Sequence, residues 1–284
     1  MKRFDDGPSR LDAGLPRIKV IPTLQPPAEP VRSQPLHIDY TQTRVLPDAI
    51  GRALRVPGVA GPDRGPLAEA FKVLRLQLRQ RLQADGHRVL GVTSARALVG
   101  KSITALNLAL AMAADLDTSL LLVDADLGGR TLQRLFGLDA WPGLAEHLAG
   151  GRPLTELLVN PGVERLALLP AAGVPPANAP ELLATQRAQQ LVAEMRARYA
   201  DRLLVVDLPP LLERADALAF LPHVDTTLLV VENHGTTAPD LERVGELMAP
   251  YNLVGSVMAP PDPAPAARCG WFSRWRRPPR AFYE

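Results

Sequence analysis

The stretch VTSARALVGKSITALNLAL, residues 92–110, carries the residues with the clearest chemical potential. A strand is expected to end at Thr93 and a helix to open at Gly100-Lys101-Ser102, which is the setting of a phosphate-binding loop. The helix N-terminus attracts phosphate oxygens. Lys101 would reach the β- and γ-phosphates, and the Ser102 hydroxyl would bind Mg²⁺. Gly100, Lys101, Ser102 and Ile103 are therefore the candidate nucleotide-binding residues.

The loop departs from the common pattern at several positions. Ala95 stands where the pattern has its first glycine, and Leu98 and Val99 replace small or polar residues. Glycine is the residue that most readily adopts the positive φ that a phosphate cradle often uses. Taken alone, the run is also compatible with a strand–helix junction that contains a chance Gly-Lys-Ser.

Carboxylates follow two further apolar strands. Asp124 and Asp126 end the run LLLVDAD, and Asp207 ends RLLVVD just before Pro209-Pro210. Ligands of open α/β sheets bind at this edge, where carboxylates suit Mg²⁺ coordination and deprotonation of a hydroxyl. The alternative is solvated turn acids, or a helix cap at Asp126. Three such signals in order favour nucleotide binding. The candidate catalytic residues are Lys101, Asp124, Asp126 and Asp207, and the candidate Mg²⁺ ligands are Ser102, Asp124, Asp126 and Asp207.

The elements that must position these residues alternate along the chain. Apolar runs predict strands at 88–93, 119–124, 165–169, 203–207, 226–231 and 253–258. Helices are predicted at 66–82, 101–114, 181–199 and 238–249, the last capped by Thr236 or Thr237. Buried strands separated by helices predict an α/β fold of three layers with a mostly parallel sheet. We expect a flexible Pro-rich lead-in over residues 1–64, a P-loop domain over 65–260, and a flexible tail rich in Arg and aromatic residues over 261–284.

The composition excludes some other classes. The 284 residues carry a formal net charge of +2, which does not suggest nucleic-acid binding. The single Cys269 cannot form an internal disulfide, and neither a secretory signal nor an apolar run long enough to span a membrane is evident. The sequence therefore predicts a cytoplasmic protein.

The order VTS…GKS, LLLVDAD and VVDLPP resembles the bacterial tyrosine kinases, or BY-kinases, and the likeness covers roughly residues 36 to 260. It implies a P-loop NTPase fold and an ATP- and Mg²⁺-dependent tyrosine autokinase that regulates exopolysaccharide or capsule polymerisation and export. It also implies that Asp124 activates the tyrosine hydroxyl, and that Asp126 and Asp207 hold Mg²⁺. The implied phosphoacceptor is Tyr283 in the tail.

The resemblance also implies partners. The run EAFKVLR, with Glu69, Lys72 and Arg75, is similar to a family helix that mediates self-association. A membrane polysaccharide co-polymerase would be the second partner, and the chain would lie peripherally at the inner membrane. The closest subgroup is the stand-alone kinases of exopolysaccharide operons. The alternative is a solvated face that holds an i, i+3 ion pair, and only the family resemblance favours the interface over it.

Three alternatives remain open. The tail WFSRWRRPPRAFYE suits an anionic membrane surface, but also a solvated disordered segment. Family members usually have basic residues at the positions of Gly128 and Gly129, an Asn where this chain has Ala259, and several clustered tail tyrosines. These departures are also compatible with a nucleotide-binding scaffold that transfers no phosphate, or with a partitioning-type ATPase.

Overall fold

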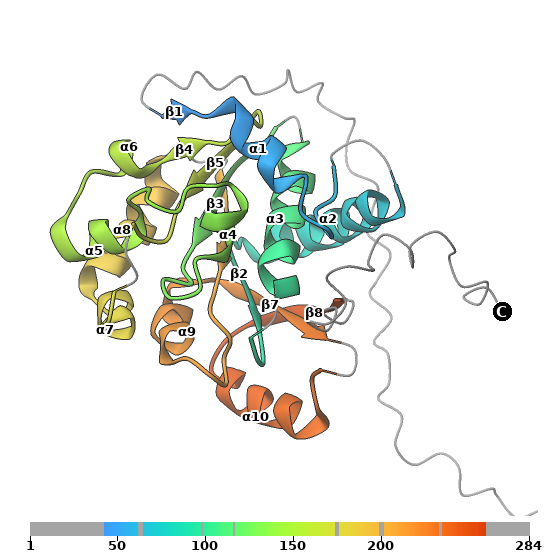
Figure 1. Cartoon of the computed structure of the whole chain (residues 1–284). Helices are drawn as coiled ribbons and strands as arrows, with labels where there is room; N and C mark the ends of the chain where they lie inside the picture. Colours follow the sequence, from blue (N-terminus) through green and yellow to red (C-terminus); the bar gives the residue numbers. More distant parts are fainter. Residues whose placement is uncertain are drawn as a thin grey trace, which may run out of the picture. The chain divides into compact units, whose positions relative to one another are not determined.

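A sheet of eight strands, in the order β1-β4-β5-β3-β6-β2-β7-β8, carries the site (Figure 1). The structure is a computed structural model that describes residues 43–61, 65–97, 99–115, 117–173, 176–198, 202–232 and 235–259. Among the described strands, every neighbouring pair is parallel except β4 and β5. The strands are β1 (Arg44–Val45), β2 (Val89–Ser94), β3 (Ser119–Asp124), β4 (Val159–Asn160), β5 (Leu166–Leu169), β6 (Arg202–Asp207), β7 (Thr226–Glu232) and β8 (Leu253–Ala259).

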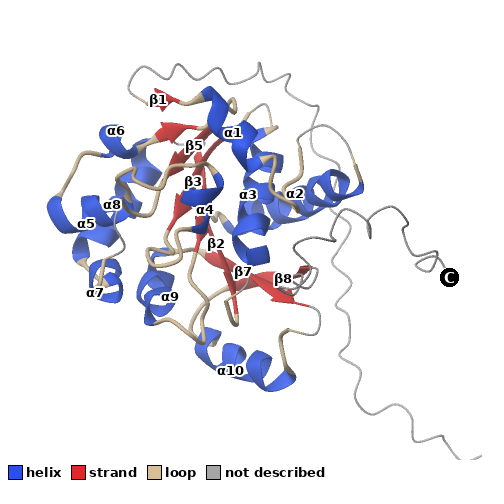
Figure 2. Cartoon of the chain, viewed as in Figure 1, coloured by secondary structure: helices blue, strands red, loops and turns tan. Residues whose placement is uncertain are grey.

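Helices cover both faces of the sheet (Figure 2). Side chains alternate along each strand, so Leu120 and Leu122 of β3 enter one core while Leu121 and Val123 enter the other. The first core is shared with α1 (Pro47–Ala53), α2 (Pro66–Asp85), α3 (Val99–Ala113) and α4 (Thr131–Leu135). The second is shared with α5 (Leu144–Gly150), α6 (Leu154–Leu157), α7 (Ala179–Leu183), α8 (Gln186–Arg198), α9 (Ala215–Phe220) and α10 (Ala238–Met248). The predicted three-layer α/β fold is confirmed.

All six predicted strands are present, and two short ones, β1 and β4, are added. The predicted helix over 181–199 is interrupted, because the Thr185 hydroxyl accepts a hydrogen bond from Ala188 N at 3.3 Å and thereby starts α8 anew. Thr237, not Thr236, caps α10: its hydroxyl accepts from Asp240 N, and the Asp240 carboxylate accepts from Thr237 N.

Residues 43–61, within the segment predicted as a flexible lead-in, contain the strand β1 and the helix α1. Pro47 opens α1, where proline fits because the first turn needs no N–H partner. Ala49 and Ala53 are buried against the sheet, and Arg44 pairs with Val159 of β4. The pairing joins segments far apart in sequence, so no local pattern announces it.

Helix α2 is amphipathic as predicted, with one exception. Leu78 is buried, and Phe71 and Leu74 pack against the same core. Leu67 is instead 38% exposed, although Ala68 beside it in the first turn is buried. Among the described residues, no helix combines the length and apolar character that a membrane span requires.

Candidate active site

The acids predicted from sequence meet at one edge of the sheet. Asp124 and Asp207 end the neighbouring strands β3 and β6 and are register partners. On the other side of β6 lies β2, in which Val92 is the register partner of Asp207, so the loop that follows Ser94 leaves from the same edge. Asp126 follows two residues after β3 and is also buried. This is the carboxyl edge, where open α/β sheets bind ligands.

Lys101 connects the phosphate loop to the acids. It lies in the first turn of α3, is 2% exposed, and places Nζ 2.6 Å from Asp207 Oδ1 and 3.5 Å from Asp126 Oδ2. Burial alone would lower the pKa of Lys101, but the carboxylates of Asp207 and Asp126 outweigh it and raise the pKa above its ordinary value. The lysine is therefore a cation held by carboxylates until a stronger anion competes for it.

Asp124 is fully buried, as is Asp207. Its Oδ2 accepts a hydrogen bond from Gln133 N at 3.1 Å, whereas Oδ1 has no partner. Burial raises the pKa of Asp124 well above its ordinary value, and the nearby negative charge of Asp207 adds to the effect. Asp207 Oδ2 is a second buried carboxylate oxygen without a partner. Buried carboxylate oxygens without a protein partner are rare, and a catalytic role, a water or an ion accounts for most of them.

These orphaned oxygens suit a hard cation such as Mg²⁺, which prefers oxygen ligands. Among the described residues, no group of three or more acidic, His or Cys side chains is arranged to hold a metal by itself. Mg²⁺ usually keeps several waters and takes phosphate oxygens together with one or two carboxylates. The residues present therefore fit a metal that arrives with a nucleotide.

The other candidate residues of the phosphate loop lie at the start of α3. The Ser102 hydroxyl is buried, 3.4 Å from Lys101 Nζ, and Gly100 is the second residue of the helix. The Ile103 side chain packs beside Gly58, so this residue can offer a nucleotide only its backbone N–H. Leu98 lies outside the described residues.

Ala95, at the position of the missing glycine, is buried in the core that α5 to α10 share. Among the described non-glycine residues, only Arg130 and Arg165 have a positive φ, so Ala95 occupies this position without that strain. Its carbonyl accepts a hydrogen bond from Leu212 N at 3.0 Å. The alanine is thus compatible with the conformation of this part of the loop.

Two arginines with carboxylate partners at the site were not predicted from sequence. Arg96, in the phosphate loop, binds Asp240 of α10 with Nη2 2.7 Å from Oδ1, and this guanidinium helps to lower the pKa of Asp240 below its ordinary value. Arg214, after β6, places Nη1 3.5 Å from Asp126 Oδ1 and Nη2 2.9 Å from Asp216 Oδ2. The one sequence signal for Arg214 is a charged residue in a loop that leaves the carboxyl edge.

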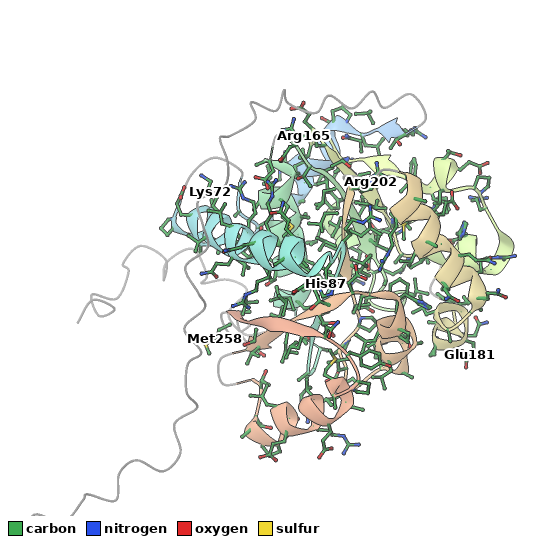
Figure 3. All side chains as sticks on the ribbon, turned by 180° about the vertical axis from the view of Figure 1, so that it is seen from behind. Lys72, His87, Arg165, Glu181, Arg202 and Met258 are labelled. Atoms are coloured by element: carbon green, nitrogen blue, oxygen red, sulfur yellow. The ribbon has the colours of Figure 1, made fainter. Side chains whose placement is uncertain are left out.

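The three candidate self-association residues of α2 have different surroundings in the structure. Glu69 and Lys72 form an exposed ion pair of 2.8 Å, and Lys72 lies on the outer side of α2 (Figure 3). Arg75 turns toward α3 instead, where it binds Asp115 at 3.1 Å and the Ala111 carbonyl at 2.9 Å. The interface itself remains a prediction.

The candidate phosphoacceptor Tyr283 and the tail around it lie outside the described residues, as do Tyr40 and Tyr199. Tyr251 packs against the core.

The chain resembles known proteins in sequence. It is 33% identical over 221 residues to the putative tyrosine-protein kinase EpsB of Ralstonia solanacearum. The matched segment covers 76% of this chain and 28% of EpsB. The chain thus spans less than a third of the length of this relative. No model of a known protein family matches the sequence.

The fold agrees with the sequence match. The crystal structure of the VpsO kinase domain aligns with a TM-score of 0.60 and 28% identity, over 69% of this chain and 97% of that one. The kinase domain of the Escherichia coli tyrosine kinase ETK aligns with a TM-score of 0.62 and 29% identity, over 68% of this chain and 75% of that one. By sequence and by fold, this chain belongs to the family of bacterial tyrosine kinases.

Proposed function

We propose that this chain binds ATP with Mg²⁺ and acts as a protein-tyrosine autokinase. The observation that carries the proposal is the buried contact of Lys101, from the start of α3, with Asp207 and Asp126 at the carboxyl edge of the sheet. The unpaired carboxylate oxygens of Asp124 and Asp207 beside it supply places for a cation and for a proton. Membership of the tyrosine kinase family supports the same conclusion.

Each residue of the site would have its own role. The N–H groups of residues 100–103 at the start of α3 would bind phosphate oxygens, and Lys101 would leave Asp207 to contact the β- and γ-phosphates. Ser102, Asp126 and Asp207 would hold Mg²⁺, with Asp124 close to it. When bound, Mg²⁺ would neutralise charge on the phosphate oxygens. The contribution of the protein is positioning and charge compensation.

Asp124 is the proposed general base. In the transfer, a bond forms between the tyrosine oxygen and the γ-phosphorus, the bond from that phosphorus to the ADP oxygen breaks, and the phenolic proton passes to Asp124 Oδ1. This oxygen has no other partner. Its raised pKa brings the carboxylate closer to the range in which a base accepts protons efficiently.

The wider role is a proposal of the same kind. We infer that the kinase regulates exopolysaccharide polymerisation or export together with a membrane polysaccharide co-polymerase, as a homo-oligomer at the cytoplasmic side of the inner membrane. Tyr283 would accept the phosphoryl group, and the arginines and aromatic residues of the tail could contact the membrane surface. No nucleic-acid partner is proposed.

The test is incubation of the purified chain with Mg-ATP, followed by detection of phosphotyrosine and of free phosphate. We expect phosphotyrosine in the parent and none in Lys101→Met. Tyr283→Phe should lose most of the signal, whereas the matched control Tyr251→Phe should keep it. Absence of phosphotyrosine in the parent would refute the kinase.

Two other outcomes correspond to the alternatives. Nucleotide binding without phosphotyrosine or free phosphate would indicate a nucleotide-sensing scaffold, which the lone tyrosine of the tail favours. Free phosphate without phosphotyrosine would indicate a partitioning-type ATPase.

A further inference from the structure

Arg214 lies just after the strand that delivers Asp207 and is the N-cap residue of α9. Its guanidinium bridges Asp126, at 3.5 Å, and Asp216, at 2.9 Å. Both acids are buried, and the Arg214 side chain is 32% exposed. Within the described part of the chain, Lys101 and Arg214 are the cations within 4.0 Å of Asp126.

A glycine makes room for this guanidinium. A Cβ atom at Gly128 would occupy the space of the Arg214 side chain, with Cζ only 2.6 Å away. The φ of Gly128 is not positive, so free space rather than backbone torsion requires glycine here. Arg214 and Gly128 therefore form one arrangement, although 86 positions separate them in the sequence.

Gly129 serves the same carboxylate. Its N–H donates a hydrogen bond to Asp126 Oδ1 at 2.8 Å, and a Cβ atom there would press against the carboxylate, 2.6 Å from Cγ. Oδ1 of Asp126 thus lies close to both a backbone amide and the Arg214 guanidinium. Both contacts need the absence of a side chain at positions 128 and 129.

The two cations near Asp126 differ in how firmly they stay there. Lys101 is closer to Asp207 than to Asp126, and the proposed function requires it to turn toward the phosphates. Arg214 has a second carboxylate, Asp216, at 2.9 Å, which holds it in the loop. When the lysine leaves, Arg214 remains as the cation at Asp126.

We infer that Arg214 is a positioning residue of the site, which holds the Asp126 carboxylate in place for the Mg²⁺ that accompanies the nucleotide. The inference rests on the proposed function and deepens it. A planar guanidinium can contact two carboxylates at once, which a lysine ammonium does less well.

The test uses the full chain and calorimetric titration with ATP, once with Mg²⁺ and once with EDTA. Arg214→Ala should weaken ATP binding about fivefold in Mg²⁺, the scale of one partly exposed ion pair, and leave it unchanged in EDTA. Arg214→Lys should recover part of the loss. Gly128→Ala should reproduce the loss, and the double variant should lose no more than either single one.

Matched controls come from parts of the chain away from the site. Arg196 has the same 32% exposure and is also ion-paired, to Asp225, so Arg196→Ala should leave ATP binding unchanged. Gly150 lies at the end of α5, where a Cβ atom would meet no described atom within 4 Å outside its own helix and chain neighbours. Gly150→Ala therefore controls for glycine replacement.

The outcomes separate the two proposals. Equal losses in Mg²⁺ and EDTA, or no loss in either, would refute the role of Arg214 while leaving the nucleotide site intact. A parent chain that binds no ATP in either buffer would refute the proposed function, and the role of Arg214 with it.

Discussion

Lys101 has two mutually exclusive sets of partners in the proposed cycle. In the structure its ammonium compensates Asp207 and Asp126, all three side chains being buried. A nucleotide would replace those carboxylates by phosphates, and Mg²⁺ would then take the place of the lysine at the acids. A buried charge without a partner is costly. The Lys101 ammonium therefore stabilises the buried acids when Mg²⁺ is absent, and Mg²⁺ would stabilise them when the ammonium turns to the phosphates.

A double-mutant cycle measures this dependence. Asp207→Asn and Lys101→Met should each lower the free energy of unfolding by about 3 kcal/mol, because each removes one partner of a buried ion pair. The double variant should lose less than the sum of the two, since it removes both charges. Urea unfolding without nucleotide is the measurement. The exposed Lys72→Met should cost less than about 1 kcal/mol, and additive losses at the site would contradict the prediction.

At the scale of elements, a carboxylate binds the backbone at the start of β2. Asp225 Oδ2 accepts hydrogen bonds from the N–H groups of Arg88 and Val89, both at 2.8 Å, and Arg196 binds its other oxygen. Burial alone would raise the pKa of Asp225, but these donors outweigh it and lower the pKa below its ordinary value. The strand that leads into the phosphate loop is therefore anchored by a charged group.

The anchor predicts a pH dependence. A lowered pKa in the folded state means that Asp225 contributes stability above the ordinary carboxyl range and loses it as the pH falls toward the folded value. Asp225→Ala should therefore cost about 1 kcal/mol at neutral pH, partial exposure screening the charge. The difference from the parent should shrink in acid.

Urea unfolding between about pH 7 and pH 3 measures that difference across the ordinary range of carboxyl groups. Asp117→Ala provides a comparison: it removes a more exposed carboxylate whose pKa Arg79 also lowers, so its loss should be smaller and should shrink in the same direction. A loss for Asp225→Ala that stays constant down to the lowest pH would show that the charge is not what anchors the strand.

At the scale of the whole molecule, α2 has some charged side chains that point outward and one that points toward α3. Arg75 is turned inward and fastens α2 to the end of α3, whereas Glu69 and Lys72 are exposed and available to another copy of the chain. The three residues of the resembling motif therefore have different roles here. The proposed self-association surface is reduced to the exposed pair.

The different roles of Arg75 and Glu69 can be tested by measuring both the free energy of unfolding and the mass in solution of their variants. Arg75→Ala should lower the free energy of unfolding by about 2 kcal/mol, because it removes charge-assisted hydrogen bonds at a mostly buried position. Glu69→Ala should leave that free energy nearly unchanged and reduce the mass measured by sedimentation. An unchanged mass for Glu69→Ala would count against the interface.

The amino-acid sequence by itself determined the layers and the acids of this protein. Apolar runs that end in Asp124 or Asp207, separated by helices, place those residues at one edge of a parallel sheet, because parallel strands all end on the same side. Lys101 follows from the Gly-Lys-Ser that opens the helix after a strand. These features are local in sequence, so periodicity and strand ends are enough to find them.

Only the tertiary structure decided which side chains meet. Arg214 reaches the space above Gly128, β1 pairs with β4, and Arg75 turns inward, and each of these contacts joins segments far apart in the chain. No pattern of spacing encodes them, since they depend on the volume that other residues leave free. The glycines at 128 and 129 look like a loss of charge in the sequence; in the fold they leave the room in which a distant arginine supplies it.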